Sequence, residues 1–194
     1  MSQFYAYLEM GFGHISDWKG YDHILFILVL CAVYNLSEWR KMAVLVTAFT
    51  VGHSTTLALS ALKIVVGNAY LIEVLIPVTI LLTSIHNLTV KDSFSKNSIV
   101  YNYILVLIFG FIHGMGFSSY FNALMDDSMN IGLPLFSFNL GLELGQLLIV
   151  SLFFTLHFLL NKVLKFPQRD WTVFFSGAGA GISAIMIIER LTTK

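Results

Sequence analysis

The chain has 194 residues, of which 57% are hydrophobic and only 11% are charged. Soluble domains carry about 25% charged residues, so this chain lacks the polar surface that a water-soluble fold needs. Eleven basic and eleven acidic residues cancel, so the charge balance indicates no nucleic-acid partner. The single cysteine, Cys31, cannot form an intrachain disulfide. The composition predicts an all-α polytopic membrane protein with the lipid bilayer around it.

Apolar segments, taken in chain order, predict the helices that cross the membrane, because a span needs about 20 mostly apolar residues. The first segment, at 4–15, is too short and predicts a short N-terminal interfacial helix. Six longer segments follow, at roughly 22–37, 42–62, 70–90, 99–121, 134–161 and 171–190. Only short polar breaks separate them. Residues 1–194 are therefore predicted to form a single transmembrane domain, a bundle of about six transmembrane helices.

The distribution of lysine and arginine among the loops predicts the orientation. Seven basic residues follow the first, third and fifth spans: Arg40, Lys41, Lys91, Lys96, Lys162, Lys165 and Arg169. The alternate loops hold Lys63 alone or the acidic pair Asp126 and Asp127. By the positive-inside rule the basic loops are cytoplasmic and both termini are extracytoplasmic. We therefore expect a multi-pass protein of a bacterial-type inner (plasma) membrane.

Ionisable residues inside the predicted spans gather at one depth. From a rise of 1.5 Å per residue, His53 lies about 16 Å from the cytoplasmic start of its span and Glu143 about 13 Å below the outer surface. Such groups are costly in a bilayer and usually face a bundle interior or a cavity. Four histidines and two carboxylates share the outer half and are the predicted metal ligands: His14, Asp22, His23, His53, His113 and Glu143.

Three further polar residues are predicted to support this site: Ser54, Asn139 and Gln146. Asn139 and Gln146 stand with Glu143 at i, i+4 and i+7, which places the three on one helical face. The same stripe is also typical of hydrogen bonds between membrane helices, so both interpretations stay open. Ser54 follows His53 directly, although serines in spans commonly bond to their own helix backbone.

Imidazole and carboxylate groups together are the ligands that zinc, nickel, cobalt, manganese and iron sites use. The absence of cysteine thiols among them argues against a structural zinc cage. The residues therefore predict a site for a divalent transition metal, with nickel and zinc favoured, open to the extracytoplasmic side.

Four segments resemble the signature blocks of the HupE/UreJ membrane proteins, in the same order through residues 11 to 146. They are "GFGHISDWKGYDHILFIL", "VTAFTVGHSTTLAL", "FGFIHGMGFSS" and "FSFNLGLELGQ". Members of that family are regarded as nickel or cobalt permeases that serve hydrogenase and urease maturation. The resemblance implies metal handling by His14, Asp22 and His23, and it matches His53, His113 and Glu143 to polar positions of the later blocks.

The sequence leaves three functions open. A divalent metal permease, nickel by resemblance, needs polar groups leading on to the cytoplasm. The candidates for that path are Thr83, His86, Asn87 and His157. A membrane-embedded, metal-dependent hydrolase would use the same ligands, with Glu143 or Asp22 as base and Asn139 or Ser54 near an oxyanion. A metal sensor within a larger assembly is the third; maturation partners and a homo-oligomer are further expectations.

Overall fold

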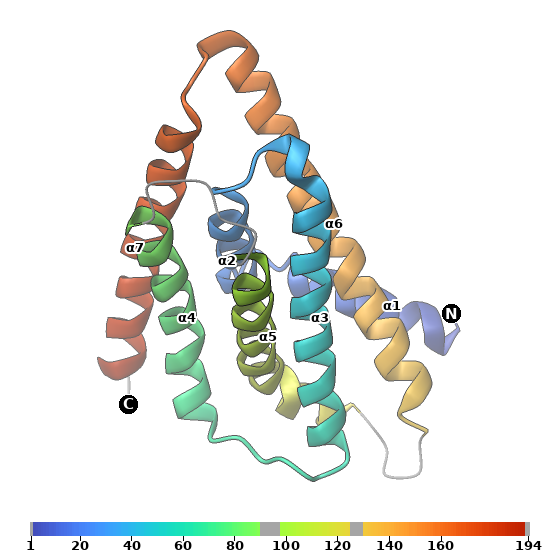
Figure 1. The fold of residues 1–194 in the computed structure, drawn as a ribbon. Coiled ribbons are helices and arrows are strands. Elements are labelled where there is room, and N and C mark those ends of the chain that lie inside the picture. The colour runs from blue at the N-terminus through green and yellow to red at the C-terminus, as the bar shows by residue number, and fades with distance from the viewer. Residues whose placement is uncertain (1, 90–97, 125–129, 193–194) are drawn as a thin grey trace.

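The computed structural model describes residues 2–89, 98–124 and 130–192, and Figure 1 shows that the described chain is all-helical. Seven α-helices and one 3-10 turn follow one another: α1 (Gln3–Ile15), α2 (Asp22–Cys31), the turn η1 (Leu36–Glu38), α3 (Trp39–Ala61), α4 (Ala69–Thr89), α5 (Ser98–Ala123), α6 (Gly132–Leu164) and α7 (Gln168–Thr192). Five segments are long and apolar enough to cross a membrane, namely Leu36–Ala61, Ala69–Thr89, Asn102–Ala123, Gly132–Leu164 and Gln168–Thr192. The predicted polytopic helical membrane bundle is confirmed.

The first predicted span, 22–37, differs from the structure. Its helix, α2, has only 10 residues and ends at Cys31, so it is about 15 Å long and cannot cross a bilayer alone. α2 instead lies inside the bundle, where it contacts α4, α6 and α7. Its Phe26 side chain reaches Phe49 of α3 and Phe109 of α5, with ring centroids 5.4 and 5.8 Å away.

Side chains from two other helices explain why α2 can end inside the bundle. The last carbonyls of a helix have no partner within it, and an unpaired carbonyl away from water is costly. The Asn87 amide donates to the carbonyl of Val29 at 2.8 Å. The carbonyl of Ala32 accepts from the Thr172 hydroxyl at 2.8 Å and from the Gln168 amide at 3.1 Å. Side chains of α4 and α7 thus donate the hydrogen bonds that the next turn of a longer helix would have given to these carbonyls.

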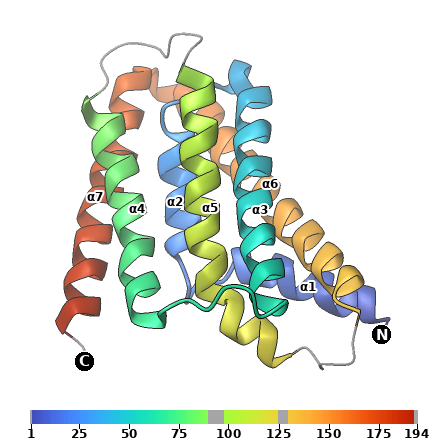
Figure 2. The ribbon, with the colours of Figure 1, turned by 60° about the horizontal axis from the view of Figure 1, so that its bottom comes forward.

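Three helix pairs surround α2, and Figure 2 shows them from a second direction: α3 with α5, α1 with α6, and α4 with α7. In two of these pairs, glycines allow the backbones of the two helices to come into contact. A Cβ on Gly110 of α5 would overlap the carbonyl of Phe49 on α3, and a Cβ on Gly141 of α6 would overlap the carbonyl of Leu8 on α1. Small residues allow such backbone contact between membrane helices. α1 is thereby held across the bundle against α6.

The start of α3 and the α6–α7 connection lie at one end of the bundle, and the α3–α4 connection lies at the other (Figure 1). Arg40, Lys162 and Arg169 belong to the first end, whereas Lys63 belongs to the second. The predicted loop residues Lys91, Lys96, Asp126 and Asp127 lie outside the described residues.

Replacing Gly141 with valine should destabilise the fold, because the new side chain must displace the backbone of α1. Overpacking of this kind costs about 1–3 kcal/mol. Gly177 on α7 is the matched control, since nothing lies within 4 Å of the position of its Cβ. We expect Gly141→Val to lower the melting temperature of the purified protein and Gly177→Val to leave it near the wild-type value. Equal melting temperatures for the two variants would contradict the close α1–α6 contact.

Candidate metal centre

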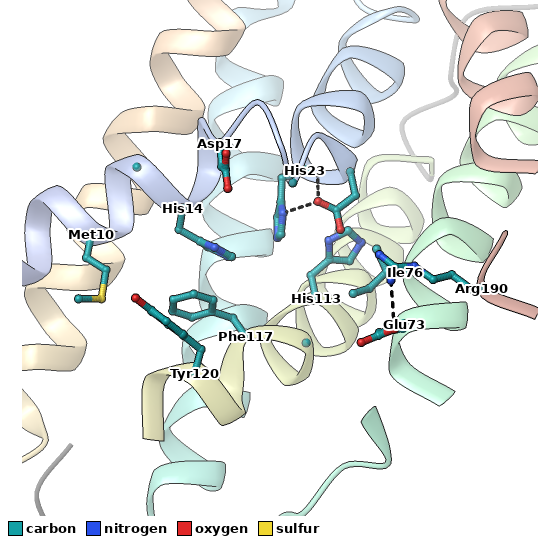
Figure 3. Close-up of a pocket in the computed structure, with 14 residues that line it drawn as sticks. Met10, His14, Asp17, His23, Glu73, Ile76, His113, Phe117, Tyr120 and Arg190 are labelled. Atoms are coloured by element: carbon teal, nitrogen blue, oxygen red, sulfur yellow. Dashed lines mark hydrogen bonds and ion pairs between the residues drawn. The ribbon is translucent and has the colours of Figure 1, made fainter. Parts of the chain in front are cut away.

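Four histidines from four helices converge in the interior. His14 comes from the end of α1, His23 from the start of α2, His53 from the middle of α3 and His113 from α5. The His23 ring lies 4.8 Å from His14 and 4.9 Å from His113, centroid to centroid. The His14 and His53 centroids are 5.7 Å apart. Figure 3 shows His14, His23 and His113 pointing toward one another from three separate helices.

Three of these imidazoles have the spacing of a metal-binding group. One ring nitrogen each of His14, His23 and His53 lies within 4.8 Å of the other two. Nitrogens that share an ion at about 2.1 Å lie at most about 4.2 Å apart, so small ring rotations bring them to binding distance. Among the described residues, no other group of three or more histidine, cysteine or acidic side chains has this geometry.

Five ring nitrogens of this cluster have no hydrogen-bond partner among the described residues. They are Nε2 of His14 and His23, both ring nitrogens of His53, and Nδ1 of His113. The side chains of His53 and His113 are 0% and 1% exposed, so bulk solvent does not reach these nitrogens. Buried polar atoms are nearly always paired. A neutral imidazole has a lone pair on one nitrogen only, so a cation would bind one nitrogen of each ring. A set of neutral imidazoles suits nickel, cobalt or zinc.

The Asp22 carboxylate fixes the tautomer of His23. Its Oδ1 accepts from the His23 ring Nδ1 at 3.0 Å and from the His23 backbone N–H at 2.9 Å. An ionised carboxylate only accepts hydrogen bonds, so the proton of the neutral ring is on Nδ1 and Nε2 carries a lone pair. Carboxylates orient metal-bound histidines in this way in many proteins. Asp22 therefore supports the site through His23.

Thr79 of α4 favours one tautomer of His113 by similar reasoning. The Thr79 hydroxyl donates its one proton to the carbonyl of Ile76 at 2.7 Å. It lies 3.2 Å from Nε2 of His113, and because its proton is already used it accepts from Nε2–H. Nδ1 of His113 is then the unprotonated nitrogen, and it is the one without a partner.

His14 lies on α1, outside the five candidate spans. Burial, together with the neighbouring His23 imidazole, lowers the pKa of His14 well below its usual range. The ring is therefore neutral at pH 7 and has a lone pair for a metal. Phe117 packs against it, with ring centroids 4.0 Å apart, and Phe138 stacks on His53. These aromatic rings hold the imidazoles in place.

Glu143 and Gln146 join α6 to α3 at positions preceding His53. The Glu143 carboxylate accepts from the Thr47 hydroxyl at 2.6 Å, and the Gln146 side-chain oxygen accepts from the Thr50 hydroxyl at 2.8 Å. Glu143 is not in the group of three histidines with metal-binding geometry. The structure thus brings His14, Asp22, His23, His53 and His113 together and gives Glu143 another partner.

The other two predicted supporting residues bond within their own helices. The Ser54 hydroxyl donates to the carbonyl of Thr50 at 2.6 Å, and the Asn139 amide donates to the carbonyl of Leu135 at 2.7 Å. Both patterns are common for polar side chains in apolar helices.

A pocket of about 510 Å³ adjoins the cluster, and His14, His23 and His113 form part of its wall. Asp17 and Asp22 line it as well. Glu73 of α4 and Arg190 of α7 form an ion pair of 3.2 Å on its lining, and about half of each side chain is exposed (Figure 3). The cluster is therefore reached from a polar pocket that carries more acidic than basic groups.

Four of the polar residues described above are not among the predicted site residues: Asp17, Glu73, Thr79 and Arg190. Thr79 had a readable signal, because Thr79, Thr83 and His86 stand at i, i+4 and i+7 on α4 and share one helical face. The ion pair joins residues 117 positions apart, and no local pattern predicts it.

Comparison with known proteins gives one match. A family model described as HupE / UreJ protein matches residues 1–190. No curated protein and no solved structure gives a significant match to the chain.

A pair of isosteric substitutions should show which of the two carboxylates, Asp22 or Glu143, contributes to metal binding. Asp22→Asn replaces the charged acceptor that holds His23 with a neutral amide, and disturbance of such a partner typically lowers metal affinity by about 10–100-fold. Glu143→Gln, which alters only the contact with Thr47, should lower it much less. Competition titrations with nickel or cobalt on the purified variants measure both. A larger loss in Glu143→Gln than in Asp22→Asn would show that Glu143 is the metal-binding carboxylate and that this assignment of Asp22 is wrong.

Proposed function

Since the chain belongs to the HupE/UreJ family, we propose that it is a divalent metal permease, with nickel as its favoured cargo. The observation that carries the proposal is the buried cluster of imidazoles with unpartnered nitrogens beside a polar pocket. A dehydrated cation in a bilayer needs ligands that replace its water, and these nitrogens provide them. Metalloenzyme-maturation proteins are the partners that membership of this family suggests.

The pocket gives the cation its approach to the cluster. Asp17 and Asp22 supply negative charge on its wall, and Glu73 offsets the charge of Arg190. Acidic walls raise the local concentration of cations and speed their binding. His14 and His23, which line this pocket, would bind the ion first, and the deeper His53 would complete its coordination.

One observation favours the second candidate, a metal-dependent hydrolase. The pocket volume of about 510 Å³ is far larger than an ion needs and falls within the range of roughly 300–1,000 Å³ typical of small-molecule sites. Three histidines with an open fourth position are also the ligand set of catalytic zinc. Asp22 lines this pocket and is the carboxylate placed to act as base.

Transport and metal content, measured on the same preparations, separate the two functions. As a permease, the wild-type protein in proteoliposomes should take up nickel, and His53→Ala should reduce uptake at least about tenfold because the deepest ligand is lost. His157→Ala is the control, since that ring packs against Trp171 with centroids 4.7 Å apart. A wild-type protein that keeps one metal through purification and moves none would overturn the permease and leave the hydrolase.

We further propose that the α3–α4 connection faces the extracytoplasmic side of a bacterial-type inner membrane, together with both termini. The positive-inside rule supports this orientation, because Arg40, Lys162 and Arg169 belong to the opposite end from Lys63. The pocket would then receive its ion from outside the cell.

Two exposed valines allow a direct test of this orientation. Val66 in the α3–α4 connection is 90% exposed and Val163 near the end of α6 is 76% exposed. In intact cells a membrane-impermeant thiol reagent should label Val66→Cys and not Val163→Cys. The native Cys31 is buried and gives no background. Reversed labelling would place the pocket on the cytoplasmic side and indicate export.

A further inference from the structure

The chain has six histidines, and two of them lie outside the cluster. His157 of α6 is packed among aromatic rings, with Trp171 4.7 Å and Phe153 6.4 Å away between centroids. His86 of α4 lines a cavity instead. The two histidines thus differ in surroundings, although both were candidates for a path to the cytoplasm.

The cavity beside His86 is small, and polar side chains from several parts of the chain are among its lining residues. Its volume is about 30 Å³, which exceeds the roughly 10–15 Å³ that one water molecule requires. It is lined by Leu30, Val33, Leu105 and Val106 and by five polar side chains: Tyr34, Thr83, His86, Asn87 and Asn102. Four of the five, all except His86, are buried.

Hydrogen bonds hold two of these polar groups against the cavity from different helices. The Asn102 amide of α5 donates to the Tyr34 hydroxyl at 3.0 Å. Asn87 of α4 donates to the carbonyl of Val29 and to the Ser176 hydroxyl. The lining is therefore assembled from three parts of the chain that are distant in sequence.

One face of α4 joins this cavity to the histidine cluster. Thr79 contacts His113, and Thr83 and His86 follow on the same face at i+4 and i+7. Seven residues of helix span about 10 Å. The polar groups continue from the cluster toward the end of the bundle at which α4 ends.

We propose that this cavity is a second, weaker binding site for the same class of divalent transition-metal ion. The inference rests on the proposed permeation, in which an ion leaves the cluster and moves along α4. His86 would supply one imidazole, and Tyr34, Thr83, Asn87 and Asn102 would supply neutral oxygens. The cluster offers several imidazoles and the support of Asp22, so it holds the ion more strongly. A weak site following a strong one suits conduction, because an ion must also be able to leave.

Cobalt(II) titration of the purified full-length protein tests the site, with visible absorption reporting each bound ion. We expect two binding events in the wild type. His86→Ala should remove only the weaker event, and His53→Ala should weaken only the tighter one. His157→Ala is the matched control and should retain both. Asn102→Asp, which places a carboxylate on the cavity wall, should shift the weaker event to lower cobalt concentration.

The outcomes distinguish this site from the permease itself. A single binding event in the wild type, or a weaker event that survives His86→Ala, overturns the second site even if the protein transports nickel. Two events with the expected losses, in a protein that moves no metal into proteoliposomes, support the second site and overturn permeation. If His86→Ala does not fold, the shift in Asn102→Asp decides the question, and an unchanged weaker event overturns the site.

Discussion

A polar group inside a membrane bundle has no water to bond to, and the arrangement around α2 depends on this constraint. α2 begins with Asp22 and His23 and ends at Cys31, so both of its ends lie within the bundle. Asn87, Gln168 and Thr172 satisfy the carbonyls at its end. α4 and α7 must therefore lie against α2, and this contact places His23 opposite His113.

The histidine nitrogens of the site fall into two kinds, those with a hydrogen-bond partner in the described part of the chain and those without one. Asp22 and Thr79 each bond one nitrogen of a histidine, which orients the ring and, for His23, leaves the lone pair on Nε2. The remaining nitrogens stay unpaired in a region of aromatic side chains. Buried polar atoms without partners cost about 1–3 kcal/mol each. That cost is removed when a cation enters, which gives the proposed site a reason to bind metal as soon as an ion reaches it.

Much of the fold follows from the length and hydrophobicity of the segments, which predicted five of the six spans well. The end of α2 could not be predicted, because it depends on Asn87, Gln168 and Thr172, far away in sequence. The depth of the histidines indicated that they belong together, since depth follows from the rise along each helix. Periodicity placed Glu143 and Gln146 on one face of α6 but could not say which helix that face meets. In the structure it meets Thr47 and Thr50 of α3.

The packing of α1 on α6 also has a consequence for the order in which the protein folds during synthesis. Among the described residues α1 packs mainly on α6, and roughly 130 residues separate Gly11 from the backbone of Phe138 and Leu142 that it meets. At roughly 5–20 residues per second, a ribosome needs several seconds or more to supply that partner. Until then α1, which carries His14, lacks the helix on which it mainly packs. The four histidines are therefore synthesised before α6, but the packing of the proposed centre is complete only once α6 is in place.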